Sequence, residues 1–471
     1  MIKIHNIRIG FETNSSSSHS FVILPEKRPT RIPDNVKTDY FGWEWRLIKH
    51  PEEIASYIIT QAFEILSKHE FLSFLEKIDT SVNLSPDTGV DHQSRFEIKG
   101  DSYILTEFLA DLYVAILCDP SVGIVTGNDN EFPPPNFENL EKHKGWSWLH
   151  ECNWYVSRPG NYYLLLSNTP PIRQRISFFH KELKPKYPES IDIKITSCCE
   201  ANCPYCHEDS SPPPKCKHCD FDVFRRVIWE ISGKTLEVAL GGGNPLLHPD
   251  FFKIFKLAHE YHVIANFTVR DSAWLNFLQT ITEDQYKLLT KYDYGIGISV
   301  SDISTVRELI LQSLKLREKF ENRKDWYWYG IPFSYTFHLI NRIHSFGFIK
   351  RLVKLLREFY YKPIILILGY KPIGRGKSYK NLKKDLNPKK LLKLDAIITF
   401  DDLAIQQLNL KRFIKPENWS KYYAGRDGEY TMYLDLVELK FASSSASEKR
   451  YDMNKFSTVR DMFNFVRKEV V

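Results

Sequence analysis

Short apolar segments alternate with amphipathic stretches from Ile191 to Gly369, and this alternation limits the possible folds more than any other feature of the chain. Such a pattern is typical of successive strand–helix units whose strands lie parallel in one sheet. Six strands are expected, at residues 191–196, 235–240, 262–269, 295–300, 331–340 and 363–369. Helices are expected between them, at residues 221–232, 249–261, 304–320 and 346–360. The sequence therefore predicts an α/β fold built on a partial (β/α)6 barrel.

Several of these strands also alternate between apolar and polar residues. Because neighbouring side chains of a strand point to opposite faces, apolar residues facing the helices would leave the polar ones on the inner side. The pattern predicts a polar lumen that holds a polar ligand, and a solvated sheet face is the alternative explanation. The residues on that side are Asp192, Lys194, Thr196, Glu237, Asn266, Thr268, Arg270, Ser299, Ser334, Thr336 and His338.

The rest of the chain divides around this region. With 471 residues, the chain is long enough for about three domains. Residues 1–185 are expected to form an N-terminal α+β domain of unknown fold for substrate docking, with one helix near Pro51–Leu75, and Lys181–Ser190 is the expected linker. The barrel is expected over residues 186–378. Residues 379–471 are expected to form a small C-terminal cap containing a hairpin turning at Asp427–Gly428.

Charge and hydropathy exclude few partners. The net charge of +6 permits a nucleic acid but does not require one. No apolar run approaches the roughly 18 residues that span a membrane, and no signal peptide is visible at the start, so we expect a cytoplasmic protein without a membrane partner.

Six of the eight cysteines lie between Cys198 and Cys219. Crowded thiols in a large cytosolic chain favour metal binding or redox chemistry over a disulfide framework. Cys199, Cys203 and Cys206 follow the first predicted strand, where the loops of a parallel sheet build active sites. A [4Fe-4S] cluster needs four ligands, so three cysteines would leave one iron open.

This loop resembles the CxxxCxΦC motif of the radical S-adenosylmethionine (SAM) superfamily, with Tyr205 at the aromatic position. The resemblance covers about Ile191 to Gly376. It implies that Cys199, Cys203 and Cys206 hold a [4Fe-4S] cluster whose open iron is chelated by SAM. Electron transfer would then split SAM to a 5′-deoxyadenosyl radical, which takes a hydrogen atom from the substrate.

The run GGGNPLLHPD after the second predicted strand resembles the family's glycine-rich element, which binds the SAM methionine group. The resemblance assigns Gly242, Gly243 and Asn244 to this role, with Tyr205 packed beside them. Asn244 stands where the family commonly has Glu. A neutral amide would lose roughly 1 kcal/mol of charge-assisted hydrogen bonding at that point.

The same resemblance places further SAM contacts on later strands, and Ser299, His338 and Asn341 are the candidates. No catalytic acid or base is assigned. The turn Lys371–Ser378 lacks the first glycine of a P-loop, and its Arg375 and Lys377 are expected to be solvated charges, with contact to a carboxylate or phosphate as the alternative.

Cys198, Cys216 and Cys219 leave two alternatives open. They are free thiols, or they bind a second metal: Cys216 and Cys219 as half of a zinc site with His207 and His218 nearby, or as part of an auxiliary cluster together with Cys198.

The function that follows is a radical SAM enzyme acting on a peptide, a protein or a nucleic acid, supplied with electrons by a donor such as a flavodoxin or ferredoxin. The alternative is a non-catalytic iron–sulfur or zinc protein on a degenerate radical SAM scaffold.

Overall fold

A computed structural model divides the chain into two compact units, residues 1–185 and 186–471. It describes residues 3–7, 18–23, 32–42, 46–48, 50–78, 80–91, 98–118, 122–126, 147–150, 154–168, 171–180, 182–291, 295–322, 330–360, 363–416, 419 and 423–470. The boundary between the units lies inside the predicted linker.

The first unit is an α+β domain with two main sheets. Their strand orders are β1-β13-β12-β11-β8 and β10-β2-β9-β5, and two short pairs, β3-β6 and β4-β7, complete the unit. The elements are β1 (Lys3–Ile7), β2 (Ser18–Ile23), β3 (Asn35–Lys37), β4 (Tyr40–Phe41), β5 (Arg46–Ile48), α1 (Pro51–Ile65), α2 (Lys68–Ile78), β6 (Ser81–Asn83), β7 (Gly89–Val90), β8 (Ile98–Gly100), α3 (Ser102–Leu117), β9 (Val122–Thr126), β10 (Ser147–His150), β11 (Trp154–Ser157), β12 (Tyr163–Asn168) and β13 (Pro171–Ser177).

The single helix predicted near Pro51–Leu75 is wrong, because the chain forms α1 and α2 there. Leu66 has an extended backbone and ends α1. Ser67 and Glu70 then form a capping box: the Glu70 carboxylate accepts from the Ser67 N–H at 2.8 Å, and the Ser67 hydroxyl accepts from the Glu70 N–H at 3.4 Å. This Ser-x-x-Glu signal is visible in the sequence and predicts the start of α2.

The second unit alternates strands and helices from its first residues. Its elements are β14 (Ser190–Thr196), α4 (Phe221–Ile231), β15 (Glu237–Gly242), η3 (Pro245–Leu247), α5 (Phe251–Glu260), β16 (Ile264–Arg270), α6 (Asp271–Thr280), α7 (Glu283–Lys291), β17 (Gly295–Ser299), α8 (Ile303–Glu321), β18 (Ser334–Ile340), α10 (Phe346–Leu356), β19 (Ile364–Leu368), η4 (Gly374–Ser378), α11 (Pro388–Leu391), β20 (Ile397–Phe400), α12 (Asp402–Gln407), η5 (Leu410–Phe413), β21 (Thr431–Asp435), β22 (Lys440–Ala442), β23 (Tyr451–Asp452), η6 (Met453–Lys455) and α14 (Val459–Val470).

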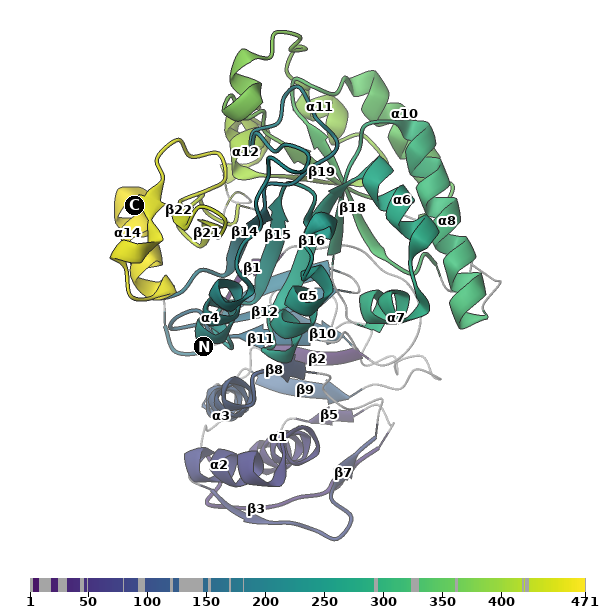
Figure 1. The fold of residues 1–471 in the computed structure, drawn as a ribbon. Coiled ribbons are helices and arrows are strands. Elements are labelled where there is room, and N and C mark those ends of the chain that lie inside the picture. The colour runs from purple at the N-terminus through teal and green to yellow at the C-terminus, as the bar shows by residue number, and fades with distance from the viewer. Residues whose placement is uncertain are drawn as a thin grey trace. The chain divides into compact units, whose positions relative to one another are not determined.

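The six predicted strands are confirmed as β14 to β19, which lie parallel and in chain order. Helices α4, α5, α6, α8 and α10 lie along the outside of this curved, open sheet (Figure 1). Polar caps begin three of these helices, since Asp220, Asp302 and Ser345 each accept a hydrogen bond from a backbone N–H of the first turn. The result is the partial barrel that the sequence predicts.

The alternation of apolar and polar residues in the strands separates buried from partly accessible side chains, as expected. In β16, β18 and β19 every second residue is buried, while the residues between them, polar in β16, mostly polar in β18 and apolar in β19, keep part of their surface accessible. Asp192 in β14 is exposed to solvent, yet the protein around it raises the pKa of its carboxyl by desolvation. Solvent exposure together with a raised pKa is expected of a carboxyl that faces a partly enclosed space, so Asp192 faces such a space. Lys194 and Thr196 are exceptions, because both are buried.

Residues 379–471 extend the sheet instead of capping it. They share a compact unit with the barrel strands, and β21 pairs in parallel with β14. The full strand order is β20-β19-β18-β17-β16-β15-β14-β21-β22-β23. A C-terminal hairpin exists, but it joins β21 to β22, while Asp427–Gly428 lies before β21 with Gly428 at φ +85°. None of the described helices is both long enough and apolar enough to cross a lipid bilayer.

Candidate functional site

The cysteine loop begins directly after β14 and is held by its own backbone. The Cys199 N–H donates to the Ser211 carbonyl at 2.9 Å, the Ser211 N–H donates to the Ser197 carbonyl at 3.1 Å, and the Cys206 N–H donates to the Cys203 carbonyl at 3.2 Å. Cys199, Cys203 and Cys206 are free thiols of intermediate exposure. The loop therefore presents three sulfur atoms at the carboxyl end of the sheet.

The three thiols share one electrostatic environment. Burial raises the pKa of Cys199 and of Cys203, and the neighbouring Cys206 raises both further. Arg270 at the end of β16 lowers both pKa values and donates from Nη1 to the Cys203 Sγ at 2.8 Å. A guanidinium beside thiols favours the thiolate form, which is the form that binds metals.

The donor set fits an iron–sulfur cluster in kind and in number. Thiolate sulfur is the ligand of iron–sulfur clusters, and three thiols from one loop leave one of four irons without a protein ligand. As the side chains stand, no group of three or more His, Cys, Asp or Glu residues in the described ranges is arranged around a metal position. The Cys203 Sγ instead accepts a hydrogen bond from Arg270, and this contact must change before the thiol can bind a cluster.

Arg375 braces the loop from the turn after β19. Its Nε donates to the Cys203 carbonyl at 2.9 Å, its Nη1 donates to the Ser210 carbonyl at 2.8 Å and pairs with Asp209 at 3.0 Å, and its backbone N–H donates to the Cys206 carbonyl at 2.9 Å. The expectation that Arg375 is a solvated charge is wrong, and the alternative, contact with a carboxylate, is what forms. No signal in the sequence links this turn to a loop far upstream.

The glycine element packs directly on the end of β14. Gly242 has φ +101°, and a Cβ atom there would collide with the Thr196 carbonyl; one on Gly243 would collide with the Cys198 carbonyl. A Cβ atom on Gly241, by contrast, would meet nothing within 4 Å. The predicted SAM contacts Gly242 and Gly243 thus have a packing role, and Gly241 is the glycine that faces open space.

Asn244 joins this packing through its backbone and its side chain. Its N–H donates to the Cys198 carbonyl at 2.6 Å, and its side-chain oxygen accepts from the Leu246 N–H at 3.2 Å, which caps η3. Its contact with SAM stays a prediction.

The other predicted SAM contacts differ in what surrounds them. The rings of Tyr205 and Tyr379 pack edge to face, with their centroids 5.6 Å apart. Ser299 ends β17 with part of its surface accessible. Burial and the charge of Lys371 lower the pKa of His338 to about 4, so its imidazole is neutral at pH 7. Asn341 is fully buried, and Asp385, Gln407 and the Leu386 N–H use its polar atoms. These bonds favour a structural role for Asn341.

A charged network links the end of the loop to the C-terminal strands. The Lys194 ammonium lies 3.1 Å from carboxylate oxygens of both Glu208 and Asp435, and the Tyr433 hydroxyl donates to Glu208 at 3.1 Å. Glu208 comes two residues after Cys206, while Tyr433 and Asp435 lie in β21. The sequence gives no sign of this network, because Tyr433 and Asp435 lie more than 200 residues after Lys194 and Glu208.

Two of the three remaining thiols of the region do not follow the free-thiol expectation. Cys198 and Cys216 form a disulfide, and Cys219 is free and buried. His207 does not join them; burial holds its pKa well below the usual range, and it faces Lys371 at 3.4 Å.

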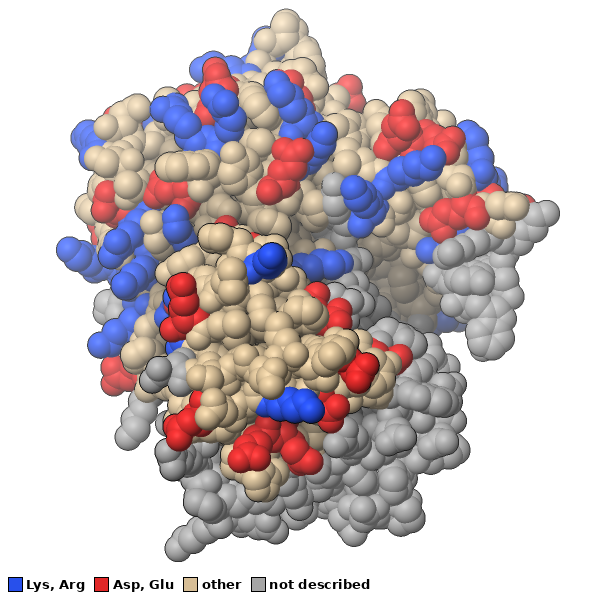
Figure 2. Space-filling view, turned by 90° about the horizontal axis from the view of Figure 1, so that it is seen from below, with Lys and Arg blue, Asp and Glu red and all other residues tan. Residues whose placement is uncertain are grey.

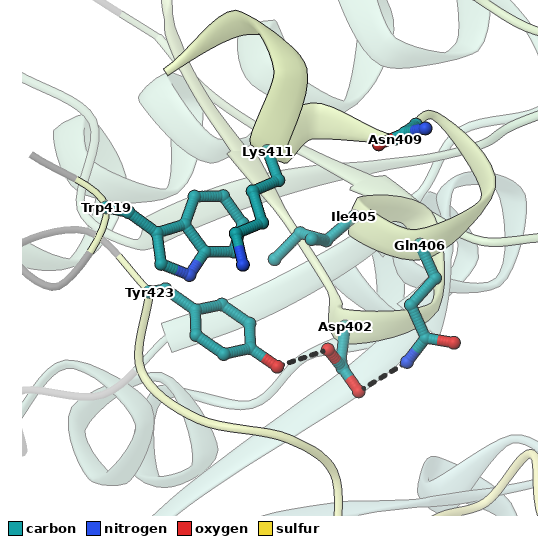
Figure 3. Close-up of a pocket in the computed structure, with 7 residues that line it drawn as sticks. All are labelled: Asp402, Ile405, Gln406, Asn409, Lys411, Trp419 and Tyr423. Carbon is teal, nitrogen blue, oxygen red and sulfur yellow. Dashed lines mark hydrogen bonds between the residues drawn. The ribbon is translucent and has the colours of Figure 1, made fainter. Parts of the chain in front are cut away.

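A pocket of about 260 Å³ lies in the C-terminal part of the second unit (Figure 3). Asp402 accepts from the Tyr423 hydroxyl at 3.1 Å and from the Gln406 amide at 2.9 Å, and the Tyr423 ring stacks on Trp419 at 4.8 Å. None of the predicted site residues lines this pocket.

Comparison with known proteins agrees with the arrangement of loop and sheet. Residues 193–326 match the family model of the radical SAM superfamily. Among solved structures, Streptococcus suis SuiB bound to S-adenosylmethionine is similar at 12% identity, with 61% of this chain and 68% of that chain covered and a TM-score of 0.44. Native anSMEcpe with bound AdoMet gives 12% identity, 60% and 83% coverage and a TM-score of 0.38. BtrN in complex with AdoMet and 2-DOIA gives 10% identity, 61% and 87% coverage and a TM-score of 0.24.

No curated protein matches the chain. The family match begins within β14 and includes the whole cysteine loop and the glycine element. The chain therefore contains a region, residues 193–326, that matches the radical SAM superfamily of enzymes, whose cofactors are a [4Fe-4S] cluster and S-adenosylmethionine.

Proposed function

We propose that this enzyme cleaves SAM reductively at a cluster held by Cys199, Cys203 and Cys206, and that it modifies a peptide or protein by hydrogen-atom abstraction. The observation that carries the proposal is the seating of this thiol loop against the glycine element. Both follow neighbouring parallel strands, and the Asn244 N–H donates to the carbonyl of Cys198, the residue before the first ligand. When bound, the cluster supplies the electron that splits the SAM sulfonium and yields the 5′-deoxyadenosyl radical.

The chain's own residues prepare this site. Arg270 favours the thiolate at Cys203, and Arg375 fixes the carbonyls of Cys203 and Cys206. Gly241 leaves open space on the inner side of β15, where the methionine group of SAM would fit. The rings of Tyr205 and Tyr379 help to exclude water, and a radical intermediate needs that exclusion.

The charges near the barrel strands favour a peptide or protein over a nucleic acid. Asp192, Asp401 and Asp427 lie close enough for the charges of Asp192 and Asp401 to raise the pKa of Asp427. Carboxylates gathered beside these strands would repel a phosphate backbone. On the face drawn in Figure 2, the Lys and Arg side chains of the described residues are interspersed with Asp and Glu and form no continuous basic stripe.

The proposal includes three further parts. Residues 1–185 would dock the substrate, because they form a compact unit of their own. A flavodoxin or ferredoxin would deliver the electron. The enzyme would work in the cytoplasm, and its free thiols, which must stay reduced to bind a cluster, support this part of the proposal.

Anaerobic reconstitution with iron and sulfide, followed by dithionite and SAM, tests the proposal. We expect about four irons per chain and 5′-deoxyadenosine as product. Cys203→Ala is the matched control and should lose both. An intact cluster that yields no 5′-deoxyadenosine would instead support the non-catalytic iron–sulfur alternative.

A further inference from the structure

A second group of sulfur and nitrogen atoms lies behind the proposed cluster loop. The Cys198 Sγ is 3.5 Å from the His218 Nε2, the His218 ring centroid is 5.1 Å from that of His248, and the His248 Nε2 is 3.6 Å from the Cys219 Sγ. Cys216 is bonded to Cys198 through the disulfide. Three sulfurs and two imidazoles thus form one connected cluster that shares no thiol with Cys199, Cys203 and Cys206.

The hydrogen bonds around His218 are compatible with an available Nε2. The Thr196 hydroxyl lies 3.3 Å from the Lys217 carbonyl, which only accepts, and can donate to it. With the hydroxyl hydrogen placed there, the His218 Nδ1, 3.0 Å from the same hydroxyl, donates to it. The neutral ring then carries a lone pair on Nε2, the atom that faces Cys198. An imidazole whose Nδ1–H is held in this way is set up as a metal ligand.

His248 has the opposite tautomer. Its Nδ1 accepts from the Asp250 N–H at 3.0 Å, so the proton of the neutral ring is on Nε2. That Nε2–H faces the Cys219 carbonyl at 3.2 Å and lies 3.6 Å from the Cys219 Sγ. His248 therefore suits an outer-shell role, donating toward Cys219 and not binding a metal itself.

The resulting donor set is that of a structural zinc site. Zinc takes four Cys or His ligands in a tetrahedron, with Zn–S near 2.3 Å and Zn–N near 2.0–2.1 Å, which places a sulfur and a nitrogen ligand about 3.5 Å apart. The distance of 3.5 Å between the Cys198 Sγ and the His218 Nε2 matches this expected distance between two ligands of one zinc ion. Cys216 and Cys219 add the C-x-x-C spacing common in zinc sites.

We propose that Cys198, Cys216, Cys219 and His218 bind a zinc ion when Cys198 and Cys216 are reduced, and that the disulfide is the metal-free form of this site. The disulfide removes two of the four ligands, which agrees with the absence of a ready metal-ligand group among the described residues. The reduced form is the relevant one under the proposed function, because thiolates one residue away can hold an iron–sulfur cluster only in a reducing environment.

The chemistry balances with a small dithiol as reductant. The dithiol cleaves the Cys198–Cys216 bond and becomes a cyclic disulfide, leaving two cysteine thiols. Zn²⁺ then replaces the protons of Cys198, Cys216 and Cys219, and three protons pass to the buffer.

The zinc would fix the position of the cluster loop. The Cys219 N–H donates to the Ile195 carbonyl at 2.8 Å, so the C-x-x-C segment lies along the end of β14. The Cys198 carbonyl accepts from the Asn244 N–H at 2.6 Å, and Cys199 follows immediately. A metal on Cys198 therefore ties the first cluster ligand and the glycine element to one rigid support.

Metal analysis of the full chain tests the proposal. The protein is purified without oxygen in the presence of dithiothreitol, given equimolar ZnCl2, desalted and assayed for zinc and iron in the same sample. We expect about one zinc per chain. Cys216→Ser and Cys219→Ser should each lose the zinc and keep the iron, while Cys118→Ser, an exposed free thiol of the first unit, should keep both.

The histidines separate the ligand from its outer-shell neighbour. His218→Ala should lose zinc, whereas His248→Ala should retain it. Cobalt bound to the reduced wild-type chain should give the absorption spectrum of a tetrahedral thiolate site. This measurement needs no variant, so it tests the site even if a variant folds poorly.

Three results would overturn the proposal: no zinc in the reduced wild-type protein, zinc unchanged in the two cysteine variants, or thiol counts showing the disulfide still closed. Iron beyond four per chain without zinc would also exclude it. Zinc without 5′-deoxyadenosine would leave this site standing and count only against the proposed function.

Discussion

At the scale of single residues, Arg375 is a charge that the sequence predicts to be solvated. In the structure it holds the cysteine loop in place. Its guanidinium contacts two carbonyls and one carboxylate of the cysteine loop, so it takes the place of the secondary structure that the loop lacks. Hydrogen bonds from a charged group contribute about 1.5–3 kcal/mol each where they are shielded from water, and less where they are exposed. Positioning of the thiols therefore depends on a residue that binds no metal.

Arg375→Ala should lower the free energy of unfolding of residues 186–471 by about 2 kcal/mol and reduce the iron retained after reconstitution. Arg375→Lys should recover only part of both, because an ammonium cannot span the three acceptors in the same way. Thermal unfolding and iron analysis measure these effects. Lys377→Ala, an exposed residue of the same turn, is the matched control; equal effects of both alanine variants would show that Arg375 has no special role.

Asp427 predicts a pH dependence. Burial, and then the charges of Asp402 and Asp192, raise its pKa from 3.8 to about 7 in the folded protein. The folded state therefore prefers the protonated carboxyl, and stability falls as pH rises from about 4 through about 7. Asp427→Asn should raise the melting temperature at pH 8, where the carboxyl is charged, and leave it unchanged at pH 4. The exposed Asp284→Asn should have no effect at either pH, and a stabilisation of Asp427→Asn at pH 4 as large as that at pH 8 would contradict the argument.

At the scale of elements, the strand that carries the cysteine loop lies in the interior of the sheet. β14 pairs with β15 on one side and with β21 on the other, and Ile191, Ile193 and Ile195 are buried. The end of β14 is then covered by the glycine run, with no room for a side chain at Gly243. The thiol loop therefore starts from a strand end that is held by β15, by β21 and by the glycine run.

Two single substitutions in this glycine run should separate packing from ligand binding. Gly243→Ala should destabilise the protein by about 1–3 kcal/mol, because its Cβ would collide with the Cys198 carbonyl. Gly241→Ala should leave thermal stability nearly unchanged but weaken SAM binding, because its Cβ would occupy the space left for the methionine group. Calorimetric titration with SAM and thermal melts test both. Unchanged SAM affinity in Gly241→Ala would move the binding site elsewhere.

At the scale of the whole molecule, the chain consists of two compact units, and the proposed chemistry lies in the second. The cysteine loop, the glycine element and the bracing turn all fall within residues 186–471. The C-terminal strands belong to this unit as well, since β21 covers the edge of β14 and buries Met432 and Leu434.

Residues 186–471 alone should fold, bind the cluster and form 5′-deoxyadenosine without substrate, and should lose modification of the substrate if residues 1–185 dock it. A shorter piece, residues 186–378, should aggregate, because the edge of β14 and its apolar neighbours would be uncovered. Size-exclusion chromatography and product analysis compare the two pieces with the full chain. A monomeric, active 186–378 piece would show that β21 is dispensable.

The sequence by itself determined the six parallel strands, the order of the helices around them and the place of the three-thiol loop after the first strand. These features depend on local periodicity and on residues close together in the chain, so their signal survives without the fold. Only the tertiary structure decided that Arg375 braces the loop, that Glu208 joins Lys194 and β21, that Gly243 is a packing residue and that Cys198 reaches Cys216 and His218. Each of these depends on a distance between segments that the chain brings together through long-range packing, and no spacing along the sequence encodes that distance.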